Sequence, residues 1–204
     1  MRQQIVYKYK NNLYLNITNR CPVVCLYCIK YKWKMFFRGY NLGLKKEPSI
    51  KEVIKNLSKK LKEEKGIKEV VFCGYGEPLM RLNVVKKLSM WIKKNYPNIK
   101  VRVNTNGLAE AYNKINVCKK LNGLVDAISI SLNAHSETVY RSLHKTKIKE
   151  PFKKIIDFIK KAKRYIPEVI ITTICHPKID VEKVRKIAKK IDVKFKRRKY
   201  FNDN

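Results

Sequence analysis

The chain has 204 residues, of which 45% are hydrophobic, and 48 basic against 16 acidic residues give it a formal net charge of +32. This size and hydrophobic content are sufficient for one compact domain over residues 1–204. Residues 1–20 lack the apolar core of a secretory signal, and no apolar run approaches the roughly 18 residues of a membrane span, so we expect a cytoplasmic protein without membrane contact.

The first predicted strand, LYLNIT at residues 13–18, leads into a loop with Cys21, Cys25 and Cys28. Because cytosolic thiols stay reduced, this group favours a metal site over a disulfide framework. A structural zinc site requires four ligands, usually in two pairs, and a second pair is missing. Iron–sulfur clusters are held by thiolates, so the loop suggests a [4Fe–4S] cluster with one iron left open, and zinc is the alternative.

The other three cysteines are scattered over separate predicted elements. Cys118 continues the apolar face of a helix, and Cys175 is adjacent to His176, so their side chains point to opposite faces of an extended strand. Cys73 is the remaining candidate ligand. We therefore predict one cluster with three protein ligands.

Beyond this loop, apolar strands alternate with amphipathic helices. Ser49 and Glu52 form a capping box at the start of the first helix, and Gly66 follows its end. Further strands are predicted at residues 69–74, 100–105, 126–132, 168–174 and 192–197, and helical faces at residues 84–92, 112–118, 152–159 and 181–191, with an extra short helix at 136–143.

Such continuously apolar strands indicate a buried parallel sheet, arranged as a barrel or as a doubly wound sheet. In both folds the functional groups gather at the carboxyl ends of the strands. Three polar segments occupy these ends: CGYGEP at 73–78, NTNG at 104–107 and SLN at 131–133. Any one of them is compatible with an ordinary turn, but together with the cysteine loop they place polar groups on four successive strand ends.

The spacing Cys-x3-Cys-x2-Cys, with Tyr27 before the last cysteine, resembles the signature of the radical S-adenosylmethionine (SAM) superfamily. In that family SAM chelates the open iron of a [4Fe–4S] cluster, and its reductive cleavage gives a 5′-deoxyadenosyl radical that abstracts hydrogen from a substrate. The resemblance implies an enzyme with these two cofactors on an α/β fold, a partial (β/α)6 TIM-like barrel. It also implies an electron donor such as a flavodoxin or ferredoxin. The substrate and the catalytic residues that act on it stay unknown.

The resemblance also implies contacts to SAM. CGYGEP is similar to the family's glycine–glutamate–proline segment, whose backbone meets the SAM amino group, and Gly74 and Gly76 would permit that close approach. In relatives, residues at the next two strand ends reach the SAM carboxylate and ribose. The implied cofactor-binding residues are Tyr27, Gly74, Gly76, Glu77, Pro78, Thr105, Asn106, Ser131 and Asn133, and the implied cluster ligands are Cys21, Cys25 and Cys28.

Over nearly the whole chain, segments such as LYLNITNRC, GYNLGLKKEPS and LVDAISISLNA resemble the TatD-associated radical SAM proteins. That family is associated with a TatD-type metal-dependent hydrolase, and hydrolases of this type include nucleases. Nucleic acid is therefore a possible partner of the basic chain, although lysine-rich, solvated helix faces explain the same charge.

Two other functions are compatible with parts of the sequence. One is a basic nucleic-acid-binding protein with a structural Fe–S or zinc site, and the other is a simple Fe–S electron carrier, which requires a fourth thiolate. His135 and His144 flank the predicted short helix, where two positions are open to them: facing the substrate or, as we expect, solvated on the surface. Arg38 and Lys45, after the cysteine loop, are either exposed or available to an anionic substrate.

Overall fold

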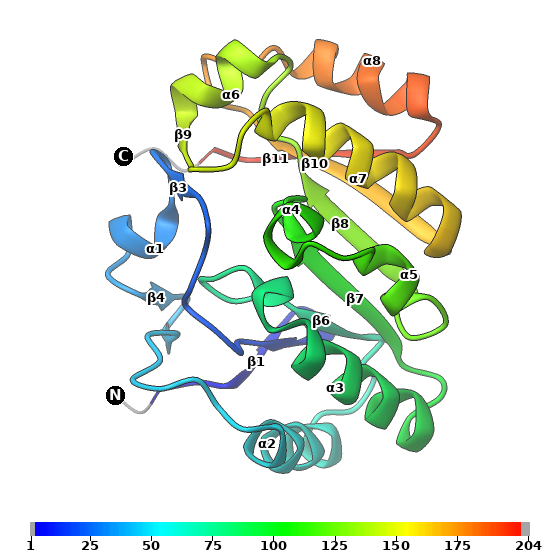
Figure 1. Ribbon diagram of the computed structural model, residues 1–204. Coiled ribbons are helices and arrows are strands. Elements are labelled where there is room, and N and C mark those ends of the chain that lie inside the picture. Colours follow the sequence, from blue (N-terminus) through cyan, green and yellow to red (C-terminus); the bar gives the residue numbers. More distant parts are fainter. Residues whose placement is uncertain (1–2, 201–204) are drawn as a thin grey trace.

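The computed structural model describes residues 3–200, which form a curved seven-stranded sheet covered by helices (Figure 1). The strand order is β1 (Val6–Tyr9), β2 (Asn12–Leu15), β6 (Glu69–Phe72), β7 (Lys100–Thr105), β8 (Ala127–Ser131), β10 (Glu168–Ile174) and β11 (Lys194–Arg198). Strands β1 and β2 form an antiparallel hairpin, and all later neighbours pair in parallel. The six predicted parallel strands are confirmed, whereas β1 was not predicted.

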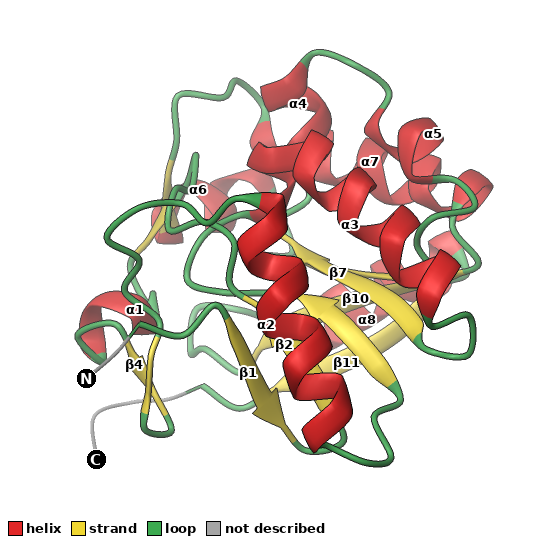
Figure 2. Ribbon diagram, turned by 90° about the horizontal axis from the view of Figure 1, so that it is seen from below, coloured by secondary structure: helices red, strands yellow, loops and turns green. Residues whose placement is uncertain are grey.

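The helices connect successive strands and lie on the outer face of the sheet (Figure 2). They are α2 (Ile50–Glu63), the 3-10 helix η1 (Pro78–Arg81), α3 (Leu82–Asn95), α4 (Ala109–Asn113), α5 (Val117–Leu121), α6 (Glu137–Leu143), α7 (Pro151–Tyr165) and α8 (Val181–Ile191). The predicted capping box of Ser49 and Glu52 is present. None of the described helices combines the length and apolar character that crossing a membrane requires.

Strand β7 shows how the sequence divides the two faces of the sheet. In KVRVNT, Val101 and Val103 are fully buried on the helix-covered face. The alternating residues Arg102 and Asn104 point the other way and line a cavity on the concave face. An inner face of polar side chains differs from the packed core of a complete TIM barrel, and it leaves space for ligands.

The loop between β2 and α2 carries four short elements on the side of the sheet away from the long helices (Figure 1). They are β3 (Val24–Cys25), α1 (Ile29–Lys32), β4 (Phe36–Phe37) and β5 (Tyr40–Asn41). Strand β3 pairs antiparallel with β9 (His144–Lys145), which follows α6. This pairing connects the cysteine loop to a segment far along the chain.

The single helical face predicted over residues 112–118 is wrong. Helix α4 ends at Asn113, Lys114 adopts a left-handed conformation, and Asn116 caps α5 by accepting a hydrogen bond from the Lys119 N–H. Ile115 lies in the connection and is exposed. The polar residues that end one helix and cap the next override the apolar spacing. Cys118 is fully buried in α5, as expected of a core residue.

Candidate functional site

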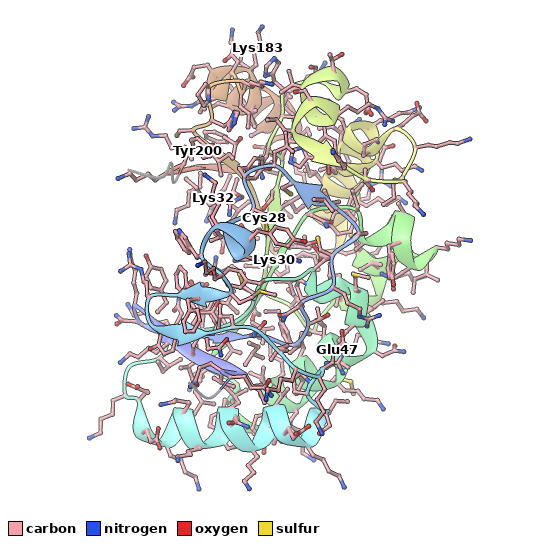
Figure 3. All side chains as sticks on the ribbon, turned by 90° about the vertical axis from the view of Figure 1, so that its left-hand side faces the viewer. Cys28, Lys30, Lys32, Glu47, Lys183 and Tyr200 are labelled. Atoms are coloured by element: carbon pink, nitrogen blue, oxygen red, sulfur yellow. The ribbon has the colours of Figure 1, made fainter. Side chains whose placement is uncertain are left out.

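The three clustered cysteines line one cavity of about 1130 Å³ on the concave face and carboxyl edge of the sheet. Cys21 follows β2, Cys25 lies in β3, and Cys28 caps α1. Figure 3 looks onto this loop, with Cys28 and Lys30 near the centre of the view. The Cys28 N–H donates to the Cys25 carbonyl at 3.1 Å, so the last two cysteines belong to one tight turn.

The environment of these thiols suits a multinuclear centre. Burial and the adjacent thiols of Cys21 and Cys28 raise the pKa of Cys25 to about 12, so the free thiol is protonated at neutral pH and a cationic iron centre would favour its thiolate. The Asn106 amide donates to the Cys21 sulfur at 3.7 Å. Within residues 3–200, no three His, Cys, Asp or Glu side chains converge as ligands of one metal ion.

His144 is buried, so the expected surface position is wrong. Its Nδ1 lies 2.8 Å from the Tyr140 carbonyl, which can only accept, so Nδ1 carries the proton and Nε2 accepts the Tyr27 hydroxyl at 2.5 Å. Its ring stacks on Tyr140 with centroids 4.1 Å apart. Burial lowers the pKa of His144 to about 4, which keeps the ring neutral in this role. His144 thereby fixes the aromatic residue between the second and third cysteines.

We expect His144→Phe to destabilise the apoprotein by about 1–3 kcal/mol, because the partly buried Tyr27 hydroxyl loses its acceptor while the ring stack is preserved. Urea unfolding measures the effect. The matched control is Tyr27→Phe, alone and combined with His144→Phe. The two losses should be strongly non-additive, since both remove the same hydrogen bond; additive losses would show that the two side chains act independently.

Glu77 connects two of the predicted strand ends. Its carboxylate accepts the Thr105 hydroxyl at 2.9 Å, the Asn106 N–H at 2.7 Å and the Leu79 N–H at 3.1 Å. Since Asn106 also reaches the Cys21 sulfur, Glu77 positions a contact to the cysteine loop. Burial raises the pKa of Glu77 to about 7, although the three hydrogen bonds oppose this rise.

This raised pKa predicts a pH-dependent stability. Below about pH 4.5, Glu77 is protonated in both the folded and the unfolded protein. Above its folded pKa of about 7, the folded protein must hold a buried negative charge. The unfolding free energy of wild type minus that of Glu77→Gln should therefore fall between pH 4.5 and 7, by roughly 3 kcal/mol, and then level off. Urea titrations of both apoproteins test this. A difference that is constant or rises with pH would contradict the burial of this carboxylate.

Gly74 and Gly76 line the cavity, but their closest neighbours belong to the chain itself. A Cβ at Gly76 would lie 2.4 Å from the Thr18 carbonyl oxygen and 2.6 Å from that of Arg20, and one at Gly74 would lie 2.1 Å from Asn16 Oδ1. The glycines thus allow residues 73–77 to pack on the segment leading to Cys21. This close approach within the chain was not predicted from the sequence.

Glu47 holds the same segment from the other side. Its carboxylate accepts the Thr18 hydroxyl and two hydrogen bonds from the Arg20 guanidinium, at 2.7 and 3.1 Å. Arg81 pairs with Glu47 at 3.2 Å and also donates to the Ile17 carbonyl at 2.7 Å. Figure 3 shows Glu47 at the lower edge of the cysteine loop, toward α2. Sequence reasoning missed this network because its members come from three separate elements.

Other predicted residues divide between the cavity and the scaffold. Ser131 and Asn133 line the cavity; Ser131 accepts a hydrogen bond from Arg198 at 3.1 Å, and Asn133 accepts the Ile174 N–H at 3.2 Å. Pro78 starts η1, is buried, and lies outside the cavity lining. Cys73 lines the cavity on a different wall from the cysteine loop, at the end of β6.

The remaining candidates lie at the margins. Cys175 is exposed, and His135 accepts the Asp180 N–H at 3.1 Å. Both side chains are exposed; Arg38 lines the cavity and lies over the Tyr9 ring at 5.1 Å, whereas Lys45 lies outside the cavity lining and its backbone N–H donates to Gln3. Of the two cations after the cysteine loop, Arg38 is therefore the one that faces the cavity.

A family model described as the radical SAM superfamily matches residues 15–191. The chain belongs to the radical SAM superfamily. It is therefore an enzyme of the class that uses a [4Fe–4S] cluster and SAM, as the cysteine spacing implied. The three thiols on one cavity wall and the polar strand ends beside them fit these two cofactors.

Known proteins similar to this radical SAM chain support the same fold. It is 28% identical to the dual-specificity RNA methyltransferase RlmN of Buchnera aphidicola subsp. Schizaphis graminum over 151 residues, which cover 69% of this chain and 38% of that protein. Its structure resembles anSMEcpe with bound AdoMet, with a TM-score of 0.68 and 21% identity over 93% of this chain and 51% of that one. TYW1 with a lysine–pyruvate adduct bound gives a TM-score of 0.66 and 19% identity, covering 94% and 65%.

These comparisons confirm the predicted α/β fold, a partial TIM-like barrel of the radical SAM type. The chain spans less than two fifths of RlmN. The comparisons support the predicted radical SAM enzyme. They lend no support to the alternative of a nucleic-acid-binding protein with a structural metal site.

Proposed function

We propose that this radical SAM enzyme holds its [4Fe–4S] cluster with Cys21, Cys25 and Cys28 as the three protein ligands. The observation that carries the proposal is the common cavity, which these three cysteines line together with the ends of the three successive parallel strands β6, β7 and β8. When bound, the cluster would supply the electron that cleaves SAM. The cysteine loop would position it, and the cavity walls would restrict the access of water.

The polar strand ends are the proposed binding surface for SAM. Residues 74–76 line the cavity, where their backbone carbonyls would meet a cationic amino group, and the Asn106, Ser131 and Asn133 side chains would offer further polar contacts. The Glu77 carboxylate is occupied by its own chain and acts as a positioning residue. Tyr27, in the cysteine loop beside this surface, is fixed by the hydrogen bond between its hydroxyl and His144.

Anaerobic incubation of the reconstituted protein with SAM and dithionite tests the function. Formation of 5′-deoxyadenosine and methionine is expected, and Cys25→Ala should form neither. If the reconstituted wild-type protein carries a full cluster and yields no 5′-deoxyadenosine with any reductant, including reduced flavodoxin and ferredoxin, the proposed reaction is wrong.

The proposed setting is a single radical SAM core domain over residues 1–204, in the cytoplasm, with a flavodoxin or ferredoxin as electron donor. Several segments resemble those of the TatD-associated radical SAM proteins in the same sequence order, and this supports assignment to that subgroup. Inspection of the surrounding genome tests the assignment, because a TatD-type hydrolase gene is expected nearby. RlmN is by name an RNA methyltransferase, which together with the charge of +32 supports nucleic acid as the substrate class.

A further inference from the structure

We propose that the cavity binds a nucleotide segment of the substrate, with a phosphate at Lys196 and Arg198 and a base against the rings of Tyr9, Tyr14 and Phe37. This inference rests on the proposed function, because it names the substrate class of the same cavity. Two opposite walls carry it, one cationic and one aromatic.

The cationic wall is the carboxyl half of β11. Lys196 and Arg198 both line the cavity, and Arg198 donates to the Ser131 hydroxyl at 3.1 Å. Neither forms an ion pair with a carboxylate among residues 3–200. Lys194, two positions earlier, pairs with Glu168 at 2.6 Å. Along β11, the first cation, Lys194, is therefore paired with a carboxylate, whereas Lys196 and Arg198 at the cavity are not.

A second inner-face cation strengthens the contrast. Arg102, on β7, also lines the cavity, and its guanidinium pairs with Glu69 at 2.9 Å. The Arg198 side chain lines the cavity and is solvent-accessible, and it donates to the Ser131 hydroxyl, which carries no charge. A cation that lines a cavity without a carboxylate partner is available to form charge-assisted hydrogen bonds with an anion. An arginine also matches the planar, bidentate geometry of a phosphate.

The aromatic wall comes from the other end of the sheet. Tyr9 lies 5.7 Å from Phe37 and 6.0 Å from Tyr14 between ring centroids. All three rings line the cavity and are only partly buried. Bases stack on such rings with little sequence preference, at about 1–3 kcal/mol per base. Arg38, above Tyr9, adds positive charge beside them.

The curvature of the sheet brings the two walls together. Strands β1 and β11 are its opposite edges, yet residues from both line one cavity. The volume of about 1130 Å³ exceeds the roughly 300–1,000 Å³ of a pocket for one small ligand, so there is room for a substrate group beside SAM. Acidic side chains would meet the cations but have no flat rings to stack, whereas each nucleotide carries both a phosphate and a base, so the two walls together favour a nucleotide.

Fluorescence anisotropy with labelled probes at about 0.15 M salt, where non-specific binding is weak, tests the inference. The probes are a mixed-sequence RNA hexamer, an abasic hexamer of the same charge and hexaglutamate. The reconstituted protein should bind the RNA at least tenfold more tightly than either comparator. If the abasic hexamer binds as tightly as the RNA, the proposed stacking of a base on the aromatic rings is wrong. If hexaglutamate binds as tightly, the proposal of a nucleotide ligand is wrong.

Arg198→Gln should weaken RNA binding at least tenfold, whereas Lys189→Gln, which removes the same charge from the exposed face of α8, should change it less than twofold. Equal losses would show a general polycation effect and overturn the site. Iron content confirms that both variants assemble. Because wild-type 5′-deoxyadenosine formation is measured separately, a failed probe series with intact SAM cleavage rejects the nucleotide alone, whereas absent cleavage rejects the proposed function.

Discussion

Reconstituted Cys25→Ala protein should lose essentially all of its iron, whereas Cys73→Ala should keep about four irons per chain. Both cysteines line the cavity, which makes Cys73 a matched control. Cys25 lies in the loop with two neighbouring thiols that raise its pKa, and Cys73 lies on another wall, beside Asn104 and Arg102. Loss of one of three thiolates leaves the cluster with two protein ligands.

Iron and sulfide analysis, with electron paramagnetic resonance of the reduced protein, measures this difference without depending on activity. A SAM-induced change in the resonance is expected for wild type and for Cys73→Ala. If Cys73→Ala removes the iron as fully as Cys25→Ala does, the cluster has a fourth protein ligand and no open iron for SAM.

Gly76→Ala should destabilise the apoprotein by roughly 3 kcal/mol or more and reduce iron incorporation. The added Cβ would lie 2.4 and 2.6 Å from two carbonyl oxygens of the segment before Cys21. Both are backbone atoms, which cannot move away as the end of a flexible side chain can. The segment would have to shift, and Cys21 with it.

Gly66→Ala provides the control. Gly66 has a φ of +73°, and nothing lies within 4 Å of its added Cβ, so this substitution should cost only about 1–2 kcal/mol of left-handed backbone strain. Urea unfolding and iron content compare the two variants. Equal destabilisation, with full iron incorporation by Gly76→Ala, would contradict the packing of residues 73–77 against the cysteine loop.

The strands that were predicted and those that were missed differ in their physical signal. Residues 69–72 read EVVF and residues 127–131 read AISIS, so their apolar and β-branched side chains made both strands recognisable from sequence. Strand β1 reads VYKY, and its aromatic rings form part of the cavity wall. The two-residue strands β3 and β9 are too short for any periodicity and depend on contacts made by the folded chain.

The candidate site divides in the same way. The cysteine spacing is local, so its chemistry was readable without a structure. The glycines of CGYGEP signalled a close approach, but a glycine does not reveal what approaches it. A single histidine gives no sign of burial, and the Tyr27 partner of His144 lies 117 positions away. The importance of Arg198 emerged only from comparison with Lys194 and Arg102, whose carboxylate partners lie on neighbouring strands.

The pairing of β3 with β9 also determines when, during synthesis, the cysteine loop can reach its folded position. Cys25 leaves the ribosome long before His144 and Lys145, the residues that hold its strand in place. Tyr27 and His144 are 117 positions apart in the sequence. At a translation rate of about 5–20 residues per second, the three thiols are therefore exposed for roughly 6–25 seconds before His144 is synthesised. Loading of iron into the finished pocket must therefore follow synthesis of most of the polypeptide, and during that interval the cell's reducing capacity has to protect the thiols from oxidation.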